Sequence, residues 1–180
     1  MEFNTVDLLQ ELNERVQSHL EFALSLETIS NTQLNAKKDV KSWSALECLE
    51  HLNLYGHFYI PEMKKRMNAS SAPASAIFKS GRLGNKFAHD MLPKEGMKTM
   101  KTFKSKNPIH SQLNPPEVIQ TFIDQQKKFL ELLKIAQTKD LTKIKTSITL
   151  PLMKFRLGDT FRFVIYHNER HIMQAKKILI

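Results

Sequence analysis

Apolar residues recur every three or four positions along four long stretches of this 180-residue chain. In the first stretch, residues 5–30, the spaced residues are Leu9, Leu12, Val16, Leu20, Ala23 and Leu26. The other three stretches span residues 44–67, 114–138 and 158–179. This period is typical of amphipathic helices, and four such helices can bury their apolar faces against one another in a bundle. We therefore expect an all-α four-helix bundle, with residues 1–180 forming one domain.

Two of these helices carry start signals. Ser44-Ala-Leu-Glu47 is a capping box, in which the serine oxygen accepts a backbone N–H three residues on and the glutamate reaches back. Asn114-Pro-Pro-Glu117 places an asparagine at the cap and proline in the first turn. Both signals fix where a helix begins.

The connections between the helices differ in character. Residues 31–42 are polar and lack periodically spaced apolar residues, so we interpret them as the connection between the first two helices. Residues 68–114 lose the helical period over an unusual length, which predicts a long crossover between the second and third helices, with a short helix near 85–91. Apolar and polar residues alternate within 142–157, and this stretch is expected to be extended.

Composition excludes several classes of protein. Five glycines and seven prolines are too few for a small sandwich or barrel with many tight turns. The single cysteine, Cys48, excludes a disulfide framework and cysteine-based zinc or iron–sulfur sites, and we expect it in the core. No apolar run reaches the roughly 18 residues of a membrane span, and the acidic N-terminus lacks a signal-peptide pattern. We therefore expect a cytoplasmic protein with no membrane partner.

Much of the positive charge lies in one segment. The chain has a net charge of +9, and residues 79–106 contain eight basic and two acidic side chains. Such a segment can bind phosphates, so a basic, non-catalytic binding module is an alternative function. The segment lacks a helix-turn-helix, a zinc-finger spacing and paired stacking aromatics, so we do not expect nucleic acid as the partner.

Two histidines interrupt the apolar face of the last helix. His167 and His171 are four residues apart and therefore lie on one helical face, where both can bind one metal ion. His51 lies on the inward face of the second helix and is the best candidate for a third ligand, with His19 a weaker one. His57 is six residues after His51 and cannot share its face.

The competing interpretation is structural. A single histidine on an apolar face is more often a hydrogen-bonded core residue than a ligand. Three buried imidazoles without a shared partner would, however, leave several polar nitrogens unsatisfied. Both interpretations stay open at this point.

The chain resembles a known family at two motifs. Trp43-Ser44-x-x-Glu47-x-x-x-His51-Leu52 and His167-Asn-Glu-Arg-His171-x-x-Gln174 are similar to those of the DinB-like superfamily, with its DinB and YfiT relatives. The resemblance implies an up-down-down-up four-helix bundle with a three-histidine site for a divalent metal, often zinc or nickel. It maps the ligands onto His51, His167 and His171, and it implies a homodimer.

The resemblance also implies two kinds of activity. Family members include thiol-dependent transferases, such as bacillithiol or mycothiol enzymes, and proposed metal-dependent hydrolases. Three neutral ligands leave a metal ion with an open position, where the pKa of bound water can fall to about 7 and a thiol can lose its proton. The expected substrate is therefore a small molecule such as a low-molecular-weight thiol, with hydrolysis as the alternative reaction.

Two further polar residues are candidates for roles beside the metal. Glu47 lies one turn before His51, where it can cap the helix or, alternatively, act as a general base. Gln174 lies three residues after His171 and can contact the site or form a core-edge hydrogen bond. Both are candidate catalytic residues.

The spacing also predicts where the site opens. His51 and His167 each lie a few turns after a predicted helix start, so we expect the metal near one end of the bundle, covered by residues 31–42 and 142–157. A thiol's carboxylates would meet basic residues there. These residues are Lys37, Lys38, Lys41 and Arg156.

Overall fold

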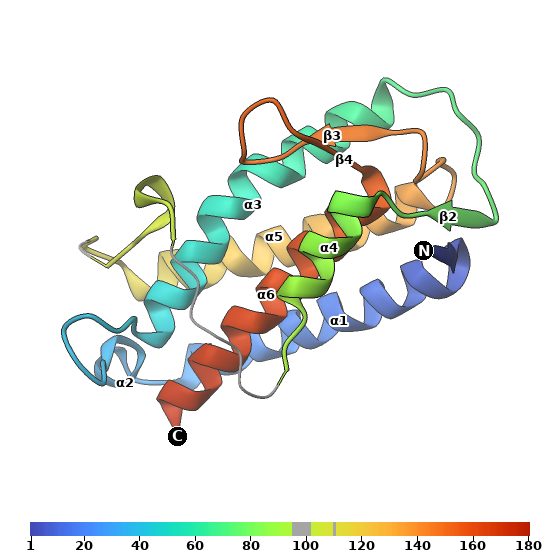
Figure 1. The fold of residues 1–180 in the computed structure, drawn as a ribbon. Coiled ribbons are helices and arrows are strands. Elements are labelled where there is room, and N and C mark those ends of the chain that lie inside the picture. The colour runs from blue at the N-terminus through green and yellow to red at the C-terminus, as the bar shows by residue number, and fades with distance from the viewer. Residues whose placement is uncertain (95–101, 110) are drawn as a thin grey trace.

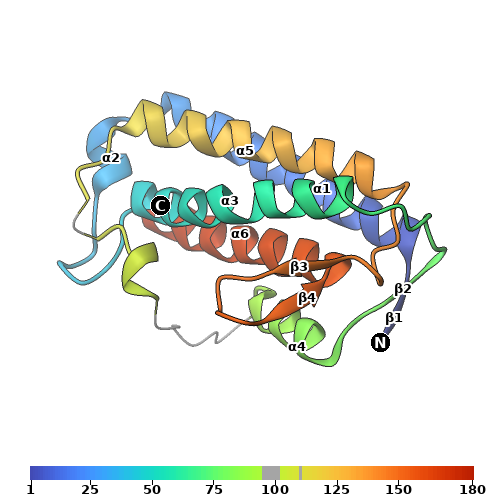
Figure 2. The ribbon, with the colours of Figure 1, turned by 90° about the horizontal axis from the view of Figure 1, so that it is seen from above.

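The computed structural model describes residues 1–94, 102–109 and 111–180, and these are mostly helical. The four long helices are α1 (Thr5–Ser25), α3 (Ala45–Asn68), α5 (Pro115–Ala136) and α6 (Leu157–Leu179). Helix α1 packs against α5 and α6, and α3 packs against the same two helices. Figure 2 shows the four helices lying side by side.

The helix starts follow the local sequence. Ser44 and Glu47 form the expected capping box at the start of α3, where the Ser44 hydroxyl accepts the Glu47 N–H at 3.1 Å. At the start of α1, the Asn4 side chain accepts the N–H of Val6 at 2.9 Å. The start of α5 differs from our expectation, because the Asn114 side chain caps no N–H; prolines occupy the first two helical positions and have none to offer.

The mostly helical structure broadly fits the all-α expectation, and it adds two short strand pairs. Strand β1 (Glu2–Asn4) pairs antiparallel with β2 (Ile77–Lys79), and β3 (Lys145–Ser147) pairs antiparallel with β4 (Lys154–Arg156). Each strand has only three residues; β3 and β4 lie in the alternating stretch 142–157, whereas β1 and β2 are too short to give such a pattern. The extended stretch 142–157 is therefore a small hairpin with turns, and Leu152 adopts φ 63° between its strands.

The connections also differ in detail. The first helix ends at Ser25, and a 3₁₀ turn η1 (Leu26–Thr28) follows it. The polar connection contains a one-turn helix α2 (Asn31–Asn35), capped by the Ser30 hydroxyl. In the crossover, α4 (Arg82–Met91) begins earlier than predicted, and a second 3₁₀ turn η2 (Lys104–Lys106) follows.

A buried polar layer divides the apolar core in two. One apolar cluster includes Tyr59, Phe129 and Phe161, and the other includes Leu49 and Phe122. In each long helix, buried polar residues fall between the members of the two clusters. They are His19 in α1, Asn53 in α3, Gln125 and Gln126 in α5, and His167 and Asn168 in α6.

Hydrogen bonds donated by side-chain amides join the polar layer across helices. The Asn53 amide donates to the Val118 carbonyl at 3.0 Å, and the Gln125 amide donates to the Asn53 carbonyl at 3.1 Å. The Asn168 amide donates to Gln126 at 3.4 Å. The polar layer therefore fixes how the helices are aligned along their length, because sliding one helix would break these bonds.

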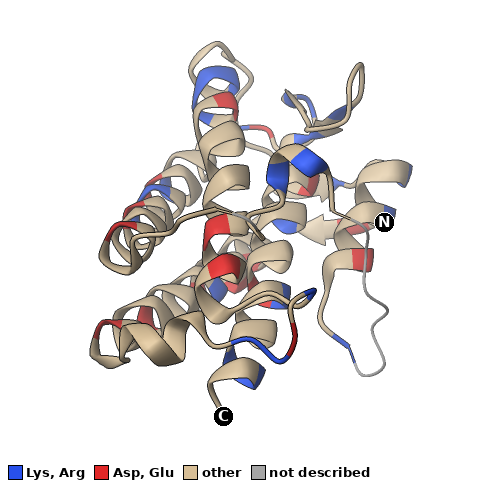
Figure 3. Ribbon diagram, turned by 90° about the vertical axis from the view of Figure 1, so that its left-hand side faces the viewer, with Lys and Arg blue, Asp and Glu red and all other residues tan. Residues whose placement is uncertain are grey.

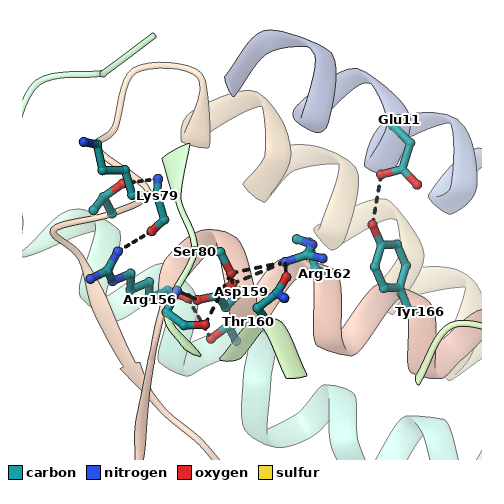
Figure 4. A network of polar contacts seen from close by, with 11 residues as sticks. Glu11, Lys79, Ser80, Arg156, Asp159, Thr160, Arg162 and Tyr166 are labelled. Atoms are coloured by element: carbon teal, nitrogen blue, oxygen red, sulfur yellow. Dashed lines mark hydrogen bonds and ion pairs between the residues drawn. The ribbon is translucent and has the colours of Figure 1, made fainter. Parts of the chain in front are cut away.

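A polar network holds the crossover against the start of α6 (Figure 4). The Asp159 carboxylate is fully buried and accepts the Ser80 hydroxyl and the Gly81 N–H, the latter at 2.7 Å. Arg162 pairs with the same carboxylate at 3.4 Å. Helix α4 thus packs along α6, as Figure 1 also shows.

Candidate metal centre

Three histidines from two helices meet in the interior. His51 comes from the second turn of α3, and His167 and His171 come from one face of α6. Their ring nitrogens offer one ligand atom each, and these three atoms all lie within 4.8 Å of one another. The Nε2 atoms of His51 and His167 are 3.2 Å apart. The structure thus brings together the three residues that the sequence analysis had singled out.

Neighbouring acceptors orient two of the rings. The Nδ1 of His51 lies 2.6 Å from the main-chain carbonyl of Lys106. The Nδ1 of His171 lies 3.1 Å from the Oε1 atom of Gln174. A neutral imidazole that donates from Nδ1 keeps its lone pair on Nε2, which is the arrangement that a metal ligand needs.

The third ring has apolar and aromatic surroundings. His167 is 6% exposed, and its Nδ1 has no hydrogen-bond partner among the described residues. The Phe163 ring stacks on it, with an interplanar angle of 2°, and the Tyr55 ring lies 4.8 Å away between centroids. The Nε2 of His167 faces that of His51.

Burial keeps all three imidazoles neutral. It lowers the pKa of His51 to about 4 and that of His171 to about 3. Burial, reinforced by the neighbouring His171 and His51, lowers the pKa of His167 well below its ordinary value. Three neutral nitrogen donors within reach of one point fit a divalent transition metal ion.

The charges beside the triad are positive. Lys106 lowers the pKa of His51, and Arg170 lowers those of His167 and His171. Among the described residues, no carboxylate contributes to any of these three shifts. A divalent ion at this point would therefore keep its full charge, and an anion is the complementary extra ligand.

Glu47 is held in the helix cap. Its Oε2 accepts the Ser44 N–H at 2.8 Å, and its Oε1 pairs with Lys37 at 2.6 Å. The carboxylate is buried and lies outside the group of residues able to hold the metal. The structural role of Glu47 is thus visible, and a catalytic role stays a prediction.

The remaining histidines lie away from the triad. His57 is exposed, as its helical phase predicts, and so is His89. His19 is buried in α1 but does not join the cluster. His110 is outside the described residues.

Cys48 belongs to the core, as expected. It is fully buried, and burial together with the Glu47 charge raises the pKa of its thiol to about 12. A thiol that stays protonated is a poor nucleophile.

The structure separates the two segments, 31–42 and 142–157, that the spacing placed over the same end of the bundle. Tyr55 contacts His167, whereas Tyr59, one turn later in α3, contacts Phe163, one turn earlier in α6. The two helices thus run in opposite directions at this contact, and their starts lie far apart. Arg156 donates to the Lys79 carbonyl at the start of α6 and belongs to the other end from Lys37.

Sequence reasoning missed the contribution of two residues. In the sequence, Trp43 is only the motif residue before the helix cap, whereas in the structure its ring lies over those of His51 and His171, with ring centroids 4.7 and 5.6 Å away. Lys106 comes from the crossover, which has no periodic signal to place it. For Trp43, the only available signal was its position directly before the capping box of a helix.

Most described lysines of the basic segment have partners. Lys79 pairs with Glu2 at 3.1 Å and Lys86 with Asp90 at 2.7 Å. Lys98 and Lys101 lie outside the described residues. In the view of Figure 3, basic residues lie on several helices, with acidic residues among them.

Two surface grooves lie apart from the triad. One of about 590 Å³ lies between α1 and α5, and one of about 350 Å³ lies between α1 and α6. Neither is lined by a histidine of the triad. Among the described residues, none of the helices combines the length and apolar character needed to cross a membrane.

Comparison with known families agrees with the motifs. The sequence model of the DinB superfamily matches residues 9–175. Comparison of the chain with curated proteins and with solved structures gave no match.

Proposed function

The chain belongs to the DinB superfamily, and from this premise we propose that it is a metal-dependent enzyme whose ion is held by His51, His167 and His171. Zinc and nickel are the favoured metals, because both accept neutral imidazole. The observation that carries the proposal is the convergence of three neutral ring nitrogens within 4.8 Å of one another.

The proposed fold supports this site. We propose that residues 1–180 form one bundle in which α1 and α6 run one way and α3 and α5 the other, the up-down-down-up order. The pairwise packing of the four helices and the direction of the colours in Figure 2 support this order. A homodimer is part of the same proposal, and light scattering in solution would test it.

The proposed reaction is transfer of a low-molecular-weight thiol to an electrophile. A divalent ion with an open position would favour the thiolate over the thiol. Lys106 and Arg170 are the charged groups that act on the triad, and both favour an anionic ligand over a cationic one. Tyr55 and Trp43 supply flat apolar surface beside the rings, on which an aromatic electrophile can pack.

Gln174 and Glu47 have different parts in this proposal. Gln174 fixes the ring of His171 by accepting its Nδ1 proton. Glu47 keeps the start of α3 in place and neutralises Lys37. Gln174 is therefore a positioning residue, and any direct catalytic role of Glu47 would require it to leave the cap.

The test uses metal-loaded protein, several low-molecular-weight thiols and a haloarene electrophile. Faster conjugation than with metal-free protein or with His171→Ala supports the transferase. If no thiol accelerates conjugation while simple esters or amides are hydrolysed, the hydrolase is correct instead. Failure to bind any metal after reconstitution at neutral pH would leave the histidines structural, as in a basic binding module.

A further inference from the structure

The crossover touches the candidate metal centre through residues 102–109. The Lys106 carbonyl lies 2.6 Å from the Nδ1 of His51. The Lys106 ammonium donates to the Leu54 carbonyl at 2.6 Å. The Asn107 side chain accepts the indole N–H of Trp43 at 3.0 Å. Three separate contacts thus join this segment to the residues of the site.

Lys106 contacts α3 at two points almost one turn apart. Its carbonyl meets His51, and its side chain reaches the carbonyl of Leu54 three residues later. The ammonium also lies 5.6 Å from the centroid of the Tyr55 ring. The backbone at Lys106 is therefore held in register with the ring that it orients.

Asn107 extends the restraint to a second imidazole. Its Oδ1 accepts from Trp43 and from the Ile109 N–H at 3.3 Å within its own turn. The Trp43 ring lies against both His51 and His171. Fixing the indole thus limits the movement of two of the three rings.

We propose that residues 102–109 are a working part of the metal centre, in which Lys106 and Asn107 are positioning residues that hold His51 and Trp43 for metal binding. This inference rests on the proposed function, because it concerns the same triad. Acceptors behind a metal-binding histidine fix its tautomer and ring orientation, and their loss weakens metal affinity.

The coupling must run both ways. If the docked segment favours metal binding, then metal binding favours docking of the segment by the same factor. Trp43 is the only tryptophan of the chain and lies on two of the rings. Its fluorescence therefore reports on both events, and Ni²⁺ at the triad should quench it.

The first experiment compares two lysines of the same 3₁₀ turn. Lys106→Ala removes the bond to Leu54, whereas Lys104 is exposed and serves as the matched control. Zn²⁺ affinity of the full chain is measured by competition with a chromophoric chelator. We expect Lys106→Ala to bind about tenfold more weakly. Lys104→Ala should match the original chain, and Lys106→Arg, which can still donate to Leu54, should recover most of the affinity.

A second variant tests the same proposal in case Lys106→Ala does not fold. Asn107→Ala leaves the Lys106 contacts in place but removes the acceptor for Trp43. It should weaken Zn²⁺ binding and reduce the Ni²⁺ quenching of the indole, with an unchanged helical circular dichroism spectrum. In a Trp43→Phe background, which lacks the donor, Asn107→Ala should have a smaller effect on Zn²⁺ affinity.

Hydrogen exchange tests the reverse direction. Zn²⁺ should slow amide exchange in residues 102–109 of the original chain and leave it unchanged in His171→Ala. If Lys106→Ala and Asn107→Ala both bind Zn²⁺ like Lys104→Ala, the positioning role is wrong although the metal site stands. If the original chain binds neither Zn²⁺ nor Ni²⁺, the proposed function fails, and this inference fails with it.

Discussion

The Nε2 atoms of His51 and His167 lie 3.2 Å apart, although 116 positions separate the two residues in the chain. Both rings are buried, and burial lowers the pKa of each. Two neutral nitrogens at this distance can share one proton or be bridged by a cation. A metal ion held by the triad would therefore replace an otherwise weak interaction between the two rings.

Removing one ligand should abolish metal binding. We expect one divalent ion per chain in the original protein and none in His51→Ala or His171→Ala, because two imidazoles hold a metal far less well than three. His57→Ala is the matched control, since His57 is exposed on the same helix. Elemental analysis after dialysis measures the ratio. Equal losses in His57→Ala and His51→Ala would show that the register of α3 is wrong.

The two polar residues beside the triad should behave differently. Gln174→Ala removes the acceptor for His171, and we expect metal affinity to fall about tenfold with little change in stability. Glu47→Ala removes the capping box and the partner of Lys37, and the free energy of unfolding should fall by about 1 kcal/mol. Titration calorimetry measures the metal affinity, and urea unfolding measures the free energy of unfolding. A metal loss in Glu47→Ala as large as in Gln174→Ala would contradict this division.

The long helices and the triad were predictable because both depend on helical phase. The apolar ladders and the capping box located α1, α3, α5 and α6 to within a few residues. Phase also separated His51 from His57, because six residues turn the helix to another face. Such signals come from residues that are close together in the chain, so they can be recognised in the sequence alone.

The contacts between distant segments were not predictable. Two strands of three residues pair across more than seventy positions at Phe3 and Phe78, and nothing in either stretch indicates its partner. The carbonyl of Lys106 belongs to the backbone and leaves no trace in residue identity. The expectation that residues 31–42 and 142–157 cover the same end of the bundle failed for a related reason, because helix spacing alone does not show which helices run in opposite directions.

A methyl group on Gly84 should destabilise the network of Figure 4. A Cβ there would lie 2.5 Å from the nearer Asp159 carboxylate oxygen and 2.6 Å from its Cβ, whereas one on Gly81 would lie 3.3 Å from the carboxylate. Asp159 is fully buried, so it cannot move aside without losing the bond to Gly81. We expect Gly84→Ala to lower the unfolding free energy by about 1–3 kcal/mol, as in overpacked cores.

Gly81→Ala provides the comparison in the same urea experiment. Its effect should be smaller, because the contact is looser. Metal stoichiometry should be unchanged in both variants, since neither glycine contacts the triad. Equal stability of the two variants would mean that α4 is not held tightly against α6.

Binding of nucleic acid should be weak and purely electrostatic. Lys79 and Lys86 are paired with carboxylates, and the described part of the basic segment presents no element that reads bases. Any binding should therefore fall steeply with added salt. Fluorescence anisotropy with labelled DNA and RNA across a salt series checks this. A sequence-specific complex at physiological salt would favour the basic binding module.

Acid should destabilise the metal-free protein through His19. This residue is 3% exposed in the polar layer, and burial, followed by the charge of Arg15, lowers its pKa to about 3. In the unfolded chain the same imidazole takes up a proton near pH 6.5. Between these values the unfolded state binds more protons, so the unfolding free energy must fall as the pH falls from about 6.5 toward 3.

Two variants separate this effect from that of the triad, which has the same sign. His19→Gln should flatten the pH dependence, and His57→Gln should not, because His57 is exposed. Urea unfolding at several pH values, with a chelator present, gives the slope for each. The triad contributes equally to both variants, so the difference between them belongs to His19. Parallel curves for His19→Gln and His57→Gln would show that His19 is already protonated in the folded protein or reaches solvent there.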